Sequence, residues 1–240
     1  MAKPKAVSVT QPAYHNRAFL ESADGRPLRI LAEYLEPMAR LNSEGIERLV
    51  VFFGSARINE DDPLGAYYSQ ARQLAQLITE WSLTLPQKER LVVCSGGGGG
   101  IMEAANRGAR EAGGSSVGFN IRLPHEQQAN PYLTPELHFE FHYFFMRKLW
   151  FTHLARAIVV FPGGFGTLDE LLDALTLMQT GKMAKIPLIL FGQEYWDDIL
   201  SIENLAKHRM ISAEDVQLIH KFASVPLAFK FLKNYLISTK

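Results

Sequence analysis

The strongest constraint on the fold is a unit that recurs along the chain: a short, continuously apolar segment, a glycine-rich turn and then a helical pattern. Residues 49–53, Leu-Val-Val-Phe-Phe, form the first such segment, and residues 91–94 and 157–161 form two more. Strands that are apolar at every position are buried on both faces, which is typical of parallel sheets covered by helices. The alternation therefore predicts an α/β fold, a doubly wound, Rossmann-like parallel sheet with helices on both faces.

The same pattern delimits the other expected elements and the domain. Further strands are predicted at residues 117–121, 137–143 and 186–191, and helices at 28–41, 64–81, 101–112, 146–155 and from the turn after residue 161 to residue 179. Beyond residue 191 only helices are expected. Residues 1–27 are polar, contain three prolines and lack a period, so a loosely ordered arm is expected before a single domain of residues 28–240.

Charge and cysteine content exclude several classes of function. Basic and acidic residues number 25 each, so no overall charge attracts nucleic acid or an anionic membrane, and neither is expected as a partner. No apolar stretch approaches the ~20 residues of a membrane span, and the N-terminus lacks the apolar region of a secretory signal. The single cysteine, Cys94, lies in an apolar run, where a small buried side chain is expected. These features predict a cytoplasmic protein.

Glycine-rich turns follow the strands that end at residues 53, 94 and 161, and ligands of such folds bind at the carboxyl ends of strands. Residues 96–100 are five glycines, which either permit a tight turn or let a ligand approach the backbone. A dinucleotide site would need an acidic residue after the next strand, where this chain has Asn120 and Arg122. The chain also lacks the G-x-x-x-x-G-K-[ST] pattern of nucleotide triphosphatases. NAD and a P-loop are therefore disfavoured.

The turn at residues 162–167, Pro-Gly-Gly-Phe-Gly-Thr, is the most specific of the three. A buried strand ends there and an amphipathic helix begins, so free backbone N–H groups and the positive end of the helix dipole meet at the turn. This arrangement predicts an anion site suited to phosphate. Glu170 follows Gly166 by four residues and Thr167 by three, so the helix carries all three on one face toward the same rim.

Two segments resemble a known family. Residues 161–170, Phe-Pro-Gly-Gly-Phe-Gly-Thr-Leu-Asp-Glu, resemble the P-G-G-x-G-T-x-x-E signature of the LOG ("lonely guy") family, cytokinin riboside 5′-monophosphate phosphoribohydrolases long named lysine decarboxylases. The family's Arg-Lys pair resembles Arg147 and Lys148, with Arg147 fifteen residues before Pro162. Residues 95–102 and Gly54-Ser55 are similar to the family's other glycine elements. The resemblance covers about residues 48–195.

The chain departs from short plant-type members in two places. Those members have Glu directly before the Arg-Lys pair, where this chain has Met146 after two phenylalanines. The N-terminal extension and the loop at residues 120–127 resemble the longer bacterial subgroup. The reaction class is therefore expected to carry over better than the identity of the base.

The resemblance implies hydrolysis of the N-glycosidic bond of a nucleoside 5′-monophosphate, a cytokinin riboside monophosphate or an AMP-like nucleotide, to free base and ribose 5-phosphate. Arg147 and Glu170 are then the expected catalytic residues. The expected substrate-binding residues are Gly54, Ser55, Gly96, Gly97, Gly98, Met146, Lys148, Gly163, Gly164, Gly166 and Thr167. No cofactor and no metal are implied. A homodimer or larger homo-oligomer is implied, and the helix from Met146, with its Trp150 and Phe151, is the candidate interface surface.

Several alternatives stay open at this point. A general nucleosidase acting on other monophosphates is the rival enzyme, and a non-catalytic nucleotide or molybdenum-cofactor carrier on the same fold is the rival binding protein. A redox Rossmann enzyme is disfavoured by the missing ribose-binding acid. A lysine decarboxylase would need a pyridoxal-phosphate lysine, and nothing marks one, since His220-Lys221 lies in a segment expected to be helical.

Overall fold

The computed structural model describes residues 11–122 and 128–238, and within them seven parallel strands form one sheet. The strand order is β4-β3-β2-β1-β5-β6-β7. The strands are β1 (Leu49–Phe53), β2 (Val92–Ser95), β3 (Ser116–Ile121), β4 (His138–Phe141), β5 (Ala155–Val160), β6 (Leu188–Phe191) and β7 (Ile219–Phe222). The predicted doubly wound α/β fold is confirmed.

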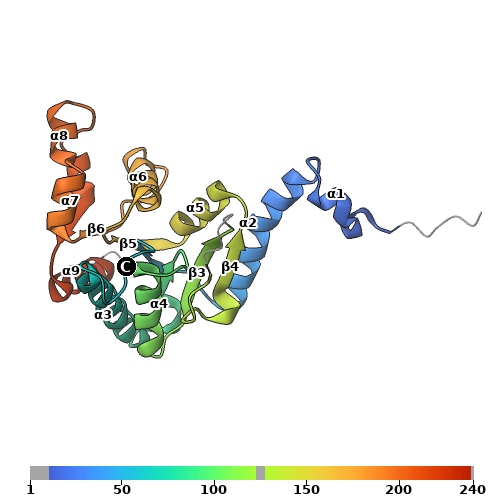
Figure 1. Ribbon diagram of the computed structural model, residues 1–240, viewed down its shortest axis with the longest axis horizontal. Coiled ribbons are helices and arrows are strands. Elements are labelled where there is room, and N and C mark those ends of the chain that lie inside the picture. Colours follow the sequence, from blue (N-terminus) through green and yellow to red (C-terminus); the bar gives the residue numbers. More distant parts are fainter. Residues whose placement is uncertain (1–10, 123–127, 239–240) are drawn as a thin grey trace, which may run out of the picture.

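Helices cover both faces of this sheet (Figure 1). One face carries α3 (Gly65–Leu83), α4 (Ile101–Glu111) and α9 (Val225–Ser238). The other carries α2 (Arg26–Ser43), α5 (Phe144–His153), α6 (Phe165–Gln179) and α7 (Gln193–Ile199). Two short helices, α1 (Arg17–Glu21) and α8 (Ile202–Lys207), and four 3-10 turns at Ala13–His15, Gln87–Glu89, Pro135–Leu137 and Asp215–Leu218 complete the described elements.

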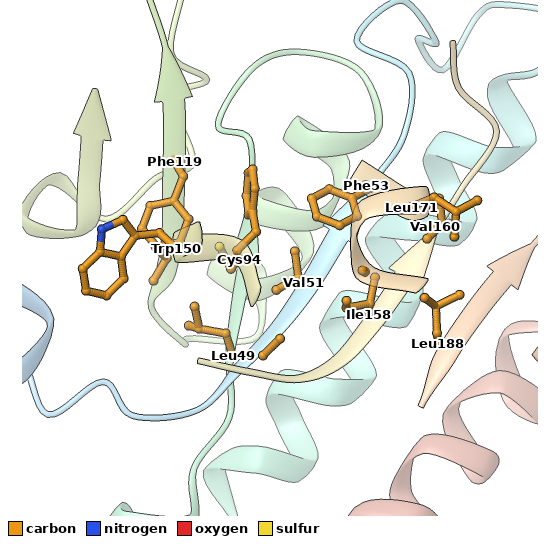
Figure 2. Close-up of a cluster of buried hydrophobic side chains, with 14 of the residues drawn as sticks. Leu49, Val51, Phe53, Cys94, Phe119, Trp150, Ile158, Val160, Leu171 and Leu188 are labelled. Atoms are coloured by element: carbon orange, nitrogen blue, oxygen red, sulfur yellow. The ribbon is translucent and has the colours of Figure 1, made fainter. Parts of the chain in front are cut away.

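The sheet has a hydrophobic core on each face, because successive side chains of a strand point to opposite faces. Leu49, Val51 and Phe53 of β1 pack into the cluster under α5 and α6, while Val50 and Phe52 pack into the cluster under α3 and α4. Every residue of β1 is buried, which is why its sequence is apolar without alternation. Figure 2 shows the first cluster, in which Cys94 lies among these side chains with none of its surface exposed. The expectation of a buried cysteine is confirmed.

The topology fixes where a ligand can bind. The chain builds β1 to β4 toward one edge and then returns to place β5 beside β1, so the strand order reverses between these two strands. In open α/β sheets the crevice outside the carboxyl ends at such a reversal is the binding site. Backbone hydrogen bonds join the turns there: the Ser55 N–H donates to the Pro162 carbonyl over 2.9 Å, and the Ile101 N–H donates to the Ser55 carbonyl over 2.9 Å.

The C-terminal part differs from the prediction of helices alone. Residues 219–222, Ile-His-Lys-Phe, form the edge strand β7, which pairs in parallel with β6. All four residues are only half-buried, and Lys221 forms ion pairs with Asp197 and Glu203 over 2.7 and 3.2 Å. Because an edge strand keeps polar side chains in water, it lacks the continuous apolar run that identifies β1 or β5.

The N-terminal segment was expected to be a loose arm. Residues 1–10 lie outside the described residues, and the part that follows contains a 3-10 turn and helix α1 before α2. Figure 1 shows α1 beyond the body of the protein, at the end of α2. Residues 123–127 of the loop that resembles the longer subgroup also lie outside the described residues. Among the described helices, none combines the length and apolarity needed to cross a membrane.

Candidate active site

Three glycine-rich turns meet at the carboxyl ends of β1, β2 and β5, as predicted. Close packing explains two of the glycines. Gly100 has a φ of 64°, and a side chain there would overlap the backbone of Ser55 and Ala56. A side chain at Gly54 would lie 2.6 Å from Ile101, the first residue of α4. These glycines therefore let the β1 and β2 turns approach each other, which is a structural role.

The turn before α6 is the part with free space around its backbone. Gly164 is the N-cap residue and no side chain caps the helix, while added Cβ atoms at Gly164 and Gly166 would meet no atom within 4 Å. Thr167 is instead buried, with its side chain packed under Gly163, and the Tyr195 hydroxyl donates to the Gly163 carbonyl over 2.7 Å. Thr167 and Tyr195 thus hold the turn at Gly163, while the uncapped N–H groups near Gly164 and Gly166 have open space around them. This arrangement suits an anion.

Arg147 and Glu170 come together at this rim. The Arg147 Nη1 lies 3.5 Å from the Glu170 Oε1, and the two side chains are only 12% and 14% exposed. The Arg147 Nε donates to the Phe119 carbonyl at 2.7 Å, and the guanidinium lies over the Phe151 ring at 5.0 Å. A side chain at Gly96 would overlap this guanidinium, so the β2 turn needs glycine there to admit Arg147.

Burial changes the acid–base behaviour of this pair. Desolvation raises the pKa of Glu170 from 4.5 to about 7, and the charge of Arg147 acts against that rise. Burial lowers the pKa of Arg147 below its usual value, and Glu170 opposes this shift. Burial also raises the pKa of Cys94, so the thiol beside the pair stays protonated. Glu170 is thus a carboxyl that exchanges its proton near neutral pH.

Two further predicted residues, Lys148 and Met146, lie on α5 next to Arg147. Lys148 turns toward α6, where its Nζ pairs with Asp169 over 3.2 Å and with Asp173 over 3.6 Å. Met146 lies in the buried cluster under α5. Both residues therefore hold α5 in place, and their predicted contacts with a substrate stay predictions.

A buried polar network lies under the β2 glycines, and sequence analysis missed most of it. Asn106 of α4 accepts hydrogen bonds from the Ser95 hydroxyl over 2.7 Å and from the Asn130 side chain over 2.9 Å. Asn130 also donates to the Gly98 carbonyl over 3.0 Å, and the Gly97 N–H donates to the Ser95 hydroxyl over 3.0 Å. The only sequence signal was a polar residue, Asn106, on the buried face of an amphipathic helix.

Comparison with family models places the chain in a known family. The family described as possible lysine decarboxylase matches residues 102–231. That segment contains Arg147, Lys148 and the turn before α6, and it excludes the β1 and β2 glycines and all of α2.

Curated relatives are similar at modest identity. A cytokinin riboside 5′-monophosphate phosphoribohydrolase of Oryza sativa subsp. japonica is 27% identical over 174 residues, covering 72% of this chain and 66% of its own length, just under two thirds. One of Arabidopsis thaliana is 24% identical over 195 residues, which cover 78% of this chain and 83% of the relative. One of Rhodococcoides fascians is 28% identical over 153 residues, covering 62% and 75%.

Solved structures share the fold. A structural-genomics target, TM1055, aligns with a TM-score of 0.56 at 24% identity, covering 78% of this chain and 99% of that one. A molybdenum cofactor binding protein of Rippkaea orientalis aligns with a TM-score of 0.56 at 21% identity, covering 78% and 96%. A molybdenum cofactor carrier protein of Chlamydomonas reinhardtii aligns with a TM-score of 0.55 at 22% identity, covering 80% and 99%.

Proposed function

The chain belongs to the LOG family, the one whose model is described as possible lysine decarboxylase, and from this premise we propose that it hydrolyses the N-glycosidic bond of a nucleoside 5′-monophosphate. The products are the free base and ribose 5-phosphate, and a cytokinin riboside monophosphate or an AMP-like nucleotide is the substrate. The observation that carries the proposal is the buried pair of Arg147 and Glu170 beside the uncapped start of α6. The curated relatives, named for this reaction on cytokinin riboside monophosphates, support it.

The 5′-phosphate binds at the turn before α6. The N–H groups around Gly164 and Gly166 and the positive end of the α6 dipole attract the dianion. A phosphate fixed there places the ribose one helical turn along α6, beside Glu170. Binding energy from the phosphate then orients the reacting carbon, which is a distant part of the same molecule.

Glu170 acts on the water and on the sugar. Cleavage of the bond between C1′ and the base nitrogen develops oxocarbenium character at C1′, by analogy with O-glycosides. An ionised Glu170 stabilises that charge and takes a proton from the attacking water as its oxygen bonds to C1′. The bonding pair leaves with the base nitrogen, which takes up a proton from solvent. Glu170 then releases to solvent the proton that it took from the water, and a pKa near neutrality lets it do both in one turnover.

Arg147 supplies a fixed positive charge. A guanidinium does not act as an acid at neutral pH, so its contribution is electrostatic and positional. Its contact with Glu170 favours the ionised carboxylate, and its bond to the Phe119 carbonyl holds the side chain in that contact. The Nη atoms also offer donors to the departing base or to the phosphate.

A carrier without turnover is the alternative from another class. The structural likeness to molybdenum cofactor carriers lies at 21–22% identity and concerns the fold alone. A carrier needs a phosphate cradle but has no need of the buried pair of Arg147 and Glu170 beside it. That pair therefore favours the hydrolase.

The test is an assay of base release. The protein is incubated with AMP, GMP, CMP and isopentenyladenosine monophosphate, and free base and ribose 5-phosphate are measured. Glu170→Gln is expected to lower kcat by about 100-fold or more while nucleotide binding survives. Glu36→Gln, an exposed change on α2, is the matched control and is expected to leave kcat unchanged.

Three outcomes would contradict parts of this proposal. Tight binding of a monophosphate without release of base would favour the carrier. Full turnover in Glu170→Gln would remove Glu170 from the mechanism and leave the reaction class intact. Release of carbon dioxide from lysine with added pyridoxal phosphate would reinstate the decarboxylase.

A further inference from the structure

We propose that Glu33 of α2 is a positioning residue, which holds the first turn of α5 so that Arg147 stays in contact with Glu170. This inference rests on the proposed function for the roles of Arg147 and Glu170. It concerns a helix that lies outside the segment matched by the family model, residues 102–231.

Glu33 binds the backbone at the corner between β4 and α5. Its Oε1 accepts a hydrogen bond from the His142 N–H over 2.8 Å, and its Oε2 accepts one from the Tyr143 N–H over 3.2 Å. Tyr143 is the N-cap residue of α5, and no side chain of α5 or of Tyr143 itself caps this helix. A carboxylate from a distant helix thus satisfies donors at a helix start, where negative charge is also favoured by the dipole.

The corner is connected directly to Arg147. The Tyr143 carbonyl accepts hydrogen bonds from the Met146 N–H over 3.1 Å and from the Arg147 N–H over 3.2 Å. One residue, Tyr143, is therefore held by Glu33 at its N–H group and holds the backbone of Arg147 through its carbonyl group. Two hydrogen bonds and one residue separate Glu33 from the arginine of the site.

Other contacts of α2 hold the same corner. The buried Trp150 of α5 donates its Nε1–H to the Glu33 carbonyl over 2.9 Å, and its ring lies 5.8 Å from that of Tyr34. Arg29 donates to the Tyr143 hydroxyl over 3.3 Å. From its other side, α5 is tied to α6 by the pairing of Lys148 with Asp169. The helix α5 is thus held between α2 and α6, the helix that carries Glu170.

The first turn of α5 is the place where such support matters. A ten-residue helix is marginal by itself, and its ends fray before its middle. Arg147 is the fourth residue of α5, and its guanidinium must stay 3.5 Å from Glu170. A displacement of about 1 Å at a reacting centre can cost on the order of 100-fold in rate.

Glu33→Gln tests the inference. A carboxamide keeps the shape but faces one of the two backbone donors with its own NH₂ group, so one of the two bonds is lost. We expect kcat to fall at least tenfold, because Arg147 is displaced. We expect KM to change less than about threefold, because the substitution leaves the turn before α6, the proposed phosphate site, untouched. Glu36→Gln, three residues further along α2 and paired with Arg40 on the surface, is the matched control and is expected to change neither constant.

A second readout separates positioning from general stability. The pKa of the Glu170 carboxyl is measured by carbon NMR in wild type and variant. The charges that act on it are Arg147 and Lys148 on α5 and Asp169 on α6. Because the Arg147 guanidinium lowers this pKa, a guanidinium displaced in Glu33→Gln lets it rise above the wild-type value, whereas a loss of global stability alone leaves it unchanged.

The Glu170 pKa decides the matter. A raised Glu170 pKa with reduced kcat supports the inference, and an unchanged Glu170 pKa overturns it, whether or not kcat and the melting temperature fall. If Glu33→Gln does not fold, Glu33→Asp, which keeps the charge but is one methylene short, is judged by the same two readouts. If the wild-type protein releases no base from any monophosphate, the proposed function fails, while the NMR measurement still tests whether Glu33 positions Arg147.

Discussion

At the scale of single residues, the acid–base behaviour of Glu170 decides what the site can do. Burial raises the pKa of this carboxyl to about 7, so Glu170, the proposed general base, is half ionised near neutrality. The kcat/KM for a nucleoside monophosphate is therefore expected to rise with pH through a limb near 7 and then level off. A pH–rate profile checks this, and a profile that falls through pH 7 would instead make Glu170 an acid.

The same shift predicts how stability depends on pH. The folded protein holds the Glu170 proton more tightly than the unfolded chain, whose pKa is near 4.5. This group therefore stabilises the folded state most below pH 4.5, and its contribution is lost as the pH rises through about 7. The loss is on the order of 3 kcal/mol. The free energy of unfolding in urea is expected to show this loss between pH 4.5 and pH 8 in wild type and Glu36→Gln. Glu170→Gln is expected not to show it.

At the scale of the element, the β2 turn depends on the polar network beneath it. Asn106→Leu is nearly isosteric, but it leaves the Ser95 hydroxyl and the Asn130 amide without their buried acceptor. Unsatisfied buried groups cost about 1–3 kcal/mol each, so we expect the free energy of unfolding to fall by about 2–4 kcal/mol. Urea unfolding measures this loss. Asn234→Leu, on the exposed side of α9, is the control, and equal losses in both variants would contradict the role of the network.

How far each element was predictable depends on whether its signal is local. The central strand β1 and the turn before α6 are specified by neighbouring residues, so their positions were predicted from the sequence. The edge strand β7 was missed because only its pairing with β6 identifies it. The bond from Arg147 to the Phe119 carbonyl and the bonds from Glu33 to the α5 corner were also missed, because they join residues 28 and more than 100 positions apart. No motif records such contacts.

At the scale of the whole molecule, the α5–α6 surface is unusually apolar. The helix from Met146 was expected to offer interface surface through Trp150 and Phe151. For these two side chains the expectation was wrong, because both are buried in the core that Figure 2 shows in part. The exposed apolar side chains of these two helices are instead Phe144, Phe145, Leu149, Phe165 and Leu172. Phe165, the first residue of α6, is 93% exposed. Large exposed apolar side chains that gather on neighbouring helices are candidates for an interaction surface.

A second copy of the chain is the partner that the family resemblance implies, and the α5–α6 surface is where we expect it to bind. A groove of about 690 Å³ lies there, with Phe145, Leu149, Leu177 and Met183 among its lining residues. We expect the wild-type protein to be a homodimer and Leu149→Glu to make it a monomer, because the new charge would have to be desolvated in a buried interface. Light scattering after size-exclusion chromatography measures the mass of each form.

The control for this change lies on the opposite face of the sheet. Leu227 on α9 is also exposed, and Leu227→Glu is expected to leave the dimer intact. A wild-type protein that is monomeric at all concentrations would contradict the prediction. A Leu149→Glu protein that stays dimeric would show that the interface lies elsewhere.

Leu149 lies two residues after Arg147 on α5, so base release is measured in the same fractions. A monomer that keeps full kcat would show that each chain holds a complete site, whereas loss of kcat with unchanged nucleotide binding would show that assembly and the Arg147–Glu170 contact depend on each other.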